Sequence, residues 1–82
     1  MSTITGLSEL ILKMIADILE LSVDNVSEEQ NFIEIGMISI GFINLIIKCE
    51  TEFDIEFEDD KFLMSNFSTI SDFISYVQSL TL

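Results

Sequence analysis

The sequence predicts an all-α fold, a four-helix bundle of three longer helices and one short helix, with a long first loop. Apolar residues recur at intervals of three and four along three segments, which is the spacing of one helix face. Proline is absent and glycine occurs only three times, whereas a turn-rich β fold would need more of both. We expect a single domain over residues 1–82 with a thin core, because a chain this short buries only about 60% of its unfolded surface.

The first predicted helix spans residues 7–20. Its apolar residues fall on one stripe, and its charged residues, among them Lys13 and Asp17, lie on the opposite side. The stripe consists of Leu7, Leu10, Ile11, Met14, Ile15, Ile18 and Leu19. This pattern is typical of a helix that packs one face against a core.

Residues 21–38 carry no sustained periodicity, and we expect them to form a long ordered loop. Val23 and Val26 are the expected apolar anchors of its first part, and Phe32 returns the chain to the core. Gly36 permits a tight bend just before the next helix, because glycine tolerates backbone angles that other residues avoid.

The second predicted helix, residues 40–52, has two apolar faces. One face would enter the core and consists of Phe42, Leu45, Ile46, Cys49 and Phe53. The opposite face consists of Ile40, Ile43 and Ile47. Either the helix is buried all round, or these isoleucines form an exposed stripe bordered by Asn44, Glu50 and Thr51. We favour the exposed stripe, because the domain is small and no remaining long segment can cover every side.

Residues 53–66 alternate apolar and acidic residues, and Asp59 to Met64 are expected to form the short helix. The stretch FDIEF would suit a β-strand by itself, but no other segment could pair with it.

The last predicted helix spans residues 70–80, and Thr69 with Asp72 resembles a capping box at its start. Its core face consists of Ile70, Phe73, Ile74 and Val77.

The charge balance excludes several classes of function. Fifteen acidic residues face three lysines and no arginine, which gives a net charge of −12. Phosphate backbones and anionic membrane surfaces are bound by Lys and Arg, so we expect no nucleic-acid or membrane partner. The acidity could steer the chain to basic protein surfaces, or it could serve only to keep an apolar chain soluble. The N-terminus lacks a signal-peptide pattern and no apolar run spans a bilayer, so we expect a cytoplasmic protein. We also expect it to be a monomer.

The chain offers few groups for chemistry. It contains no histidine, the usual general base and zinc ligand, and its acidic cluster does not follow a calcium-loop pattern. We therefore expect no catalytic residue and no metal site. Cys49 is the only cysteine, and its place on the core face of the second helix predicts a buried structural thiol.

Ser39, at the predicted start of the second helix, is the candidate functional residue. It could be a helix N-cap that accepts backbone hydrogen bonds. A catalytic nucleophile would need a base and an oxyanion hole, and the sequence supplies neither. A third possibility is a modification site, because a phosphodiester on Ser39 would lie where free N–H groups and the helix dipole favour an anion.

The residues around Ser39 resemble the acyl and peptidyl carrier protein family. Residues 32–40 are similar to the attachment motif F-x-x-L-G-x-D-S-L of that family, with Ser39 at the position of the serine. Residues 50–55 are similar to its E-x-E-F-x-I pattern, and Phe67, Thr69 and Ile70 match the start of its last helix. The resemblance covers nearly the whole chain.

The resemblance implies a carrier protein rather than an enzyme. It implies that Ser39 carries 4′-phosphopantetheine, which a phosphopantetheinyl transferase takes from coenzyme A, and that the terminal thiol of this arm holds an acyl or aminoacyl thioester. The other implied partners are a loading enzyme, either adenylating or an acyltransferase, and downstream biosynthetic enzymes. By the resemblance, Ile40, Ile43 and Ile47 map to the surface that partner enzymes read. Asn44 and Glu50, at the border of this stripe, complete the expected partner-binding residues.

Three positions depart from the family pattern. Ile38 stands where the family usually has aspartate or histidine before the serine, and Gly41 and Asn44 replace residues that are often acidic in fatty-acid carriers. The resemblance therefore favours specialised biosynthesis, of polyketide or nonribosomal-peptide type, over fatty-acid synthesis. Ile38 also motivates an alternative, a carrier-like protein–protein interaction module without the prosthetic arm.

Overall fold

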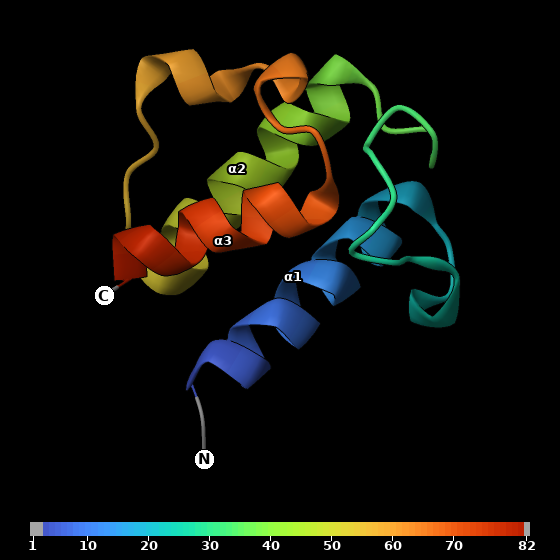
Figure 1. Cartoon of the computed structure of the whole chain (residues 1–82), viewed down its shortest axis with the longest axis horizontal. Helices are drawn as coiled ribbons and strands as arrows, with labels where there is room; N and C mark the ends of the chain where they lie inside the picture. The colour runs from blue at the N-terminus through green and yellow to red at the C-terminus, as the bar shows by residue number, and fades with distance from the viewer. Residues whose placement is uncertain (1–2, 82) are drawn as a thin grey trace.

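The computed structural model describes the backbone of residues 3–81 and the side chains of residues 6–81. Three α-helices, α1 (Thr3–Leu19), α2 (Ser39–Phe53) and α3 (Ile70–Thr81), form the body of the molecule (Figure 1). Three short 3₁₀ helices lie between them, η1 (Val23–Asn25), η2 (Asp59–Phe62) and η3 (Met64–Asn66). The described residues contain no β-strand, and the predicted all-helical fold class is confirmed.

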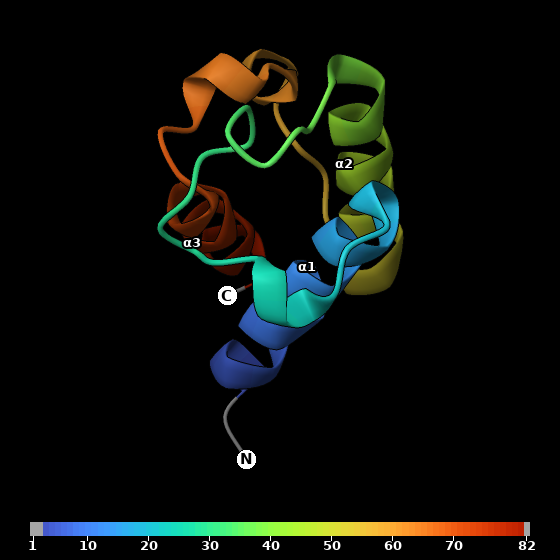
Figure 2. The ribbon, with the colours of Figure 1, turned by 90° about the vertical axis from the view of Figure 1, so that its right-hand side faces the viewer.

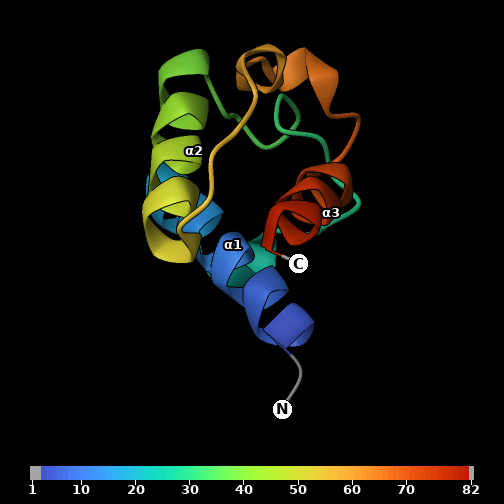
Figure 3. The same cartoon turned by 90° about the vertical axis from the view of Figure 1, so that its left-hand side faces the viewer.

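The three α-helices surround one core. Helix α1 packs against both α2 and α3. Two views at right angles to the first show α2 and α3 on opposite sides, with α1 below them and the segment of η2 and η3 above (Figures 2 and 3). The deepest side chains of α1 are Ile11 and Ile15, which are fully buried on the predicted stripe. The helix ends at a residue in the left-handed conformation, Glu20 with φ 58°, which stops further helical hydrogen bonding.

The two faces of α2 have different environments. Its core face is buried at Phe42, Leu45, Ile46 and Cys49. On the other face, the side chains of Ile40 and Ile47 are 68% and 51% exposed, while Ile43 is half-buried. The structure therefore decides between the two interpretations of this helix in favour of the exposed stripe.

Phenylalanine rings fill the core between the helices. Phe73 of α3 lies at the centre, with ring centroids 5.2 Å from Phe67, 5.5 Å from Phe32, 5.6 Å from Phe57 and 5.8 Å from Phe42. Most of these pairs meet edge to face, the arrangement that aromatic quadrupoles favour. Because these rings come from both loops and two helices, they hold the loops to the bundle.

The long first loop is ordered by hydrogen bonds at its centre. The Ser27 N–H donates to the Gln30 side chain at 2.8 Å. The loop then reaches the start of α3, where the carbonyls of Glu28 and Gln30 accept the N–H groups of Ser71 and Ile70 at 2.8 and 2.9 Å. The loop thereby supplies partners for helix N–H groups that have none within the helix.

One of the two expected apolar anchors of this loop is not buried, so that prediction is wrong. Val26 is buried, but Val23 is 45% exposed, because it begins the 3₁₀ turn η1 and that turn has no buried residue. At the end of the loop, the Thr69 hydroxyl accepts the Asp72 N–H at 3.2 Å, so Thr69 caps α3 as predicted.

The short fourth helix takes a different form from the one expected. The segment forms two 3₁₀ turns, η2 and η3, because Leu63 between them adopts the extended conformation, with φ −106° and ψ 127°. The preceding FDIEF stretch has no strand partner among the described residues, as expected. Instead, the Phe57 N–H donates to the Glu50 carboxylate at 2.9 Å, and this bond fastens the segment to α2.

Candidate functional site

Ser39 is the first residue of α2, and its side chain is exposed. The N-cap is Ile38, whose backbone is extended and whose apolar side chain makes no capping hydrogen bond. The Phe42 N–H closes the first turn onto the Ile38 carbonyl at 2.9 Å. The interpretation of Ser39 as N-cap is therefore wrong. Within the described part of the chain, no hydrogen bond occupies its hydroxyl.

A tight turn holds Ser39 in this position. Gly36 has φ +92°, a conformation that strains any residue with a side chain. The Gly36 N–H donates to the Ile33 carbonyl at 3.0 Å, and the Met37 N–H donates to the Phe32 carbonyl at 2.9 Å. Phe32 and Met37 are both buried, so the turn is anchored on each side. The exposed serine thus projects from a fixed backbone.

The start of α2 suits an anion. Its first turn contains no acidic residue, although the chain as a whole is strongly acidic. The first N–H groups of a helix lack internal partners, and the helix dipole places partial positive charge there. A phosphodiester on the exposed Ser39 oxygen would meet these groups without a carboxylate in the same turn. The residues present therefore fit an arm attached through phosphate.

The predicted partner-binding residues differ in exposure. Ile40, Asn44 and Ile47 are exposed and follow one another at helical spacing on one side of α2. Ile43 is half-buried beside them. Glu50 is also half-buried, and its carboxylate accepts the Phe57 N–H described above, so this residue has a role within the fold.

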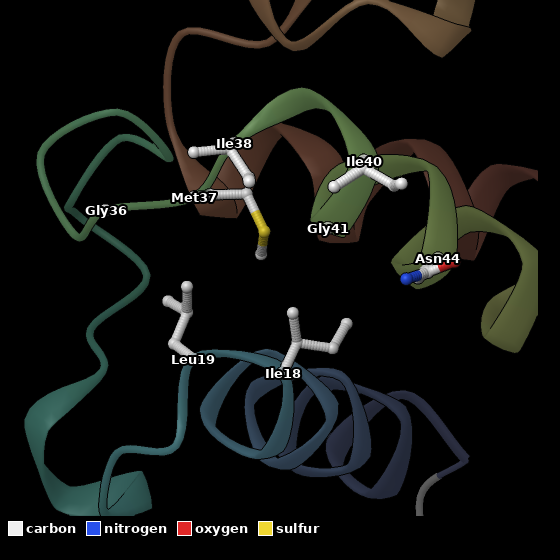
Figure 4. Close-up of a pocket in the computed structure, with 8 residues that line it drawn as sticks. All are labelled: Ile18, Leu19, Gly36, Met37, Ile38, Ile40, Gly41 and Asn44. Carbon is white, nitrogen blue, oxygen red and sulfur yellow. The ribbon is translucent and has the colours of Figure 1, made fainter.

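Sequence reasoning missed a pocket of about 390 Å³ beside Ser39. The pocket lies between the end of α1 and the start of α2, and Figure 4 shows side chains from both helices facing it. It is lined mainly by Ile18, Leu19, Met37, Ile38, Ile40, Gly41 and Asn44. The one signal in the sequence was Gly41, because a glycine inside a helix costs stability and often marks a close approach, here to Met37 and Ile18 of the pocket wall.

Cys49 is buried as predicted, and its Sγ lies 3.9 Å from the Met14 sulfur. Burial, and then the neighbouring Glu50 carboxylate, raises the pKa of the thiol from 9.0 to about 12. A thiol held in this state is a poor nucleophile.

The described residues also include no helix long and apolar enough to cross a bilayer.

The raised pKa of Cys49 predicts a loss of stability in alkali. Below pH 9 the thiol is protonated in both states and has no effect on the pH dependence. Above pH 9 the unfolded chain ionises first, so the folded state is destabilised by up to about 1.4 kcal/mol per pH unit as the pH rises toward 12. Urea unfolding between pH 7 and 10.5 should show that the free energy of unfolding falls more steeply with pH for the native chain than for Cys49→Ala. Parallel curves would contradict the prediction.

Comparison with known protein families bears directly on Ser39. The family model described as the phosphopantetheine attachment site matches residues 9–77. The matched range holds most of α1, the whole of the long loop and α2, and most of α3. Proteins of this family carry 4′-phosphopantetheine covalently on a serine, and their role is to carry a group rather than to catalyse its conversion. An exposed serine at the start of the second helix, in a helical fold matched over most of its length, shows that the chain belongs to the family of phosphopantetheine-attachment carrier domains.

Proposed function

We propose that this chain is an acyl or aminoacyl carrier protein that holds a pathway intermediate as a thioester on a 4′-phosphopantetheine arm attached to Ser39. The observation that carries the proposal is the exposed, unbonded hydroxyl of Ser39 at the start of α2, within the range that matches the attachment family.

The attachment step needs little from this chain. The Ser39 oxygen forms a bond to the phosphorus that bears the pantetheine, while the pyrophosphate bond of coenzyme A breaks and releases the adenosine bisphosphate. We assign the serine proton to a base on the transferase, because this chain contains no histidine and the first turn of α2 contains no acidic residue. The role of the chain is to present the hydroxyl on a rigid turn and to stabilise the resulting phosphodiester. The helix dipole contributes about 0.3–1 kcal/mol to that stabilisation.

The exposed stripe of α2 is the proposed docking surface for the partner enzymes. Ile40 and Ile47 supply exposed apolar area, Asn44 lies between them, and Ile43 and Glu50 form the half-buried edge. These five residues are far fewer than the roughly 20–30 per side of a stable interface, which suits a carrier that must leave each enzyme in turn. The net charge of −12 favours partners with a basic rim, such as the transferase, a loading enzyme and later enzymes of the pathway.

Ile38 supports assignment to a specialised pathway. Its side chain is 64% exposed directly before Ser39, so an enzyme that reaches the serine meets an apolar group there. An enzyme whose binding site contacts a charged or polar side chain at this position would lose that contact. We assign the carrier to a dedicated polyketide-type or nonribosomal-peptide-type route, in which it acts as a cytoplasmic monomer.

Intact mass spectrometry tests the proposal. The purified chain is incubated with coenzyme A and a promiscuous phosphopantetheinyl transferase, beside a carrier known to be modified. The expected result is a gain of one phosphopantetheine, which tandem mass spectrometry localises to Ser39. A mass that stays unchanged while the control carrier is modified would overturn the proposal.

The exposure of Ile38 also supports a second candidate, a carrier-like interaction module that needs no arm. In that case the stripe of α2 would bind one permanent partner. Ser39→Ala would then retain full biological activity, whereas a carrier would lose it completely.

A further inference from the structure

A second pocket, of about 500 Å³, lies on a different part of the surface from Ser39. In Figures 1 and 2 the chain that follows η1, which forms one wall of this pocket, lies well below the start of α2. The described lining includes no residue of α2. It comes from α1, the long loop and the start of α3, and consists of Leu12, Val26, Ser27, Glu28, Glu29 and Ser71.

This pocket opens on the side of α1 that faces away from α2. Met14 marks the side toward α2, since its sulfur lies 3.9 Å from that of Cys49. Ile18 marks the same side, because a Cβ atom on Gly41 would lie 3.3 Å from its Cγ2. Successive residues of a helix are turned by about 100°, so Leu12 is about 160° from Met14 and about 120° from Ile18 around the helix axis. An occupant of the pocket would therefore leave the exposed stripe of α2 uncovered.

The pocket has an apolar floor and an acidic rim. Val26 is buried and Leu12 is half-buried, whereas Glu28 and Glu29 are exposed. Neither carboxylate accepts a hydrogen bond within the described part of the chain. The lining includes no cation, since Lys13, which follows Leu12, is exposed and is not part of it. The pocket, here called the acidic pocket, therefore offers negative charge beside apolar surface.

Hydrogen bonds fix the backbone that carries the two carboxylates. The Glu29 N–H donates to the Ser27 hydroxyl at 3.3 Å, and the Ser27 N–H donates to the Gln30 side chain at 2.8 Å. The Glu28 carbonyl accepts the Ser71 N–H at 2.8 Å, so the same segment is joined to α3. Because this backbone is already ordered, a ligand has less conformational entropy to remove on binding.

We propose that the acidic pocket binds an arginine side chain of a partner protein. The guanidinium would donate hydrogen bonds to the carboxylates of Glu28 and Glu29, and the aliphatic part of the side chain would lie on Leu12 and Val26. Charge complementarity identifies the occupant, because two carboxylates without a cation in the lining favour a positive group and the apolar floor favours a long aliphatic stem behind it.

Arginine suits the acidic pocket better than lysine does. Its planar group donates two parallel hydrogen bonds to a carboxylate, whereas the lysine ammonium is a more strongly hydrated point charge. A pocket of about 500 Å³ is of the size that takes a drug-sized ligand, so it has room for the arginine together with a residue next to it.

A partner bound at the acidic pocket would hold the chain without covering Ser39. A second enzyme would then still reach the serine and the stripe of α2. A partner with its own active site would reach Ser39 from a tethered position, at a raised local concentration. The inference goes beyond the proposed function and does not depend on attachment of the arm.

NMR titration of the unmodified, isotope-labelled chain at physiological salt tests the proposal. The probe is a short blocked peptide with one arginine flanked by leucines. The same peptide with citrulline keeps the shape of the side chain and loses its charge, and a third peptide carries lysine. The arginine peptide should shift the backbone amide signals of Val26, Glu29 and Ser71 until they saturate. The lysine peptide should bind more weakly, and the citrulline peptide should give no saturable shift.

Two double variants of equal charge form a matched pair. Glu28→Gln with Glu29→Gln should weaken binding of the arginine peptide by roughly two- to fivefold for each carboxylate, the contribution of an exposed ion pair. Glu52→Gln with Glu56→Gln removes the same charge in another region and should change binding by less than about twofold, because salt screens distant charges. All four side chains are exposed, so both variants should keep the fold.

Three results would overturn the inference. They are equal binding of the arginine and citrulline peptides, equal loss in the two double variants, and shifts centred on the stripe of α2. The first two would mean that the arginine charge or its position beside Glu28 and Glu29 does not matter. None of them touches the proposed function, which is tested by the gain in mass at Ser39. Conversely, Ser39→Ala should bind the peptide as the native chain does, so a failure to take up the arm would overturn the proposed function alone.

Discussion

Ser39→Ala should abolish attachment of phosphopantetheine completely, because alanine has no oxygen to accept the phosphorus. The substitution should not disturb the fold. Ser39 is exposed and its side chain makes no hydrogen bond within the described structure, and such surface changes usually alter the free energy of unfolding by less than about 0.5 kcal/mol. A loss of modification would therefore report the chemistry of one hydroxyl. The measurement is the intact mass after incubation with coenzyme A and transferase.

Ser75→Ala is the matched control. Ser75 is an exposed serine on α3, so the same atom is removed far from the start of α2 along the chain. This variant should be modified to the same extent as the native chain. If Ser39→Ala gained the mass of an arm, the attachment point would be another residue and the assignment of Ser39 would fail.

Phe73→Ala should remove a large share of the free energy of unfolding. Removal of a fully buried phenylalanine costs about 3–5 kcal/mol, through lost burial and the cavity that remains. A domain of this length has a free energy of unfolding of only about 4–12 kcal/mol. Phe73 also contacts four other rings, which contribute roughly 0.5–1.5 kcal/mol per pair beyond their buried area. Urea unfolding followed by circular dichroism measures the change.

Phe62→Ala provides the comparison for this prediction. Phe62 lies in η2, is half-buried, and its ring centroid is 6.5 Å from that of Phe57. Its removal should cost roughly 1 kcal/mol, within the range of ordinary substitutions. Equal losses for the two variants would mean that Phe73 is not the centre of the core.

Helical periodicity predicted the helices well, because each helix is amphipathic and the spacing of its apolar residues defines its buried face. The stripe of the first helix, the two faces of the second and the cap of the third at Thr69 all appear in the structure. Two local features were predicted wrongly. Leu63 interrupts the expected short helix, and Val23 lies on the surface, because the backbone path of short turns depends on contacts made elsewhere in the chain.

The site was predicted in part. Ser39 could be singled out because the chain offers no other plausible group beside a helix start, and because the residues around it resemble an attachment motif. Its exact place was not predictable from sequence. The helix begins one residue earlier than expected, which moves the N-cap to Ile38 and leaves the serine hydroxyl free. Only the structure showed that Glu50 is half-buried and that its carboxylate accepts the Phe57 N–H.

The sequence by itself determined that this protein is a small acidic helical domain with one candidate hydroxyl at the head of its second helix, because charge, periodicity and residue type are local properties of the chain. The tertiary structure alone decided that the isoleucine stripe faces outward and that a pocket opens beside Ser39. The exposure of a side chain and the space beside it depend on the separation of α1 and α2. Packing between residues that are far apart in the chain, such as Ile18 and Gly41, sets this separation.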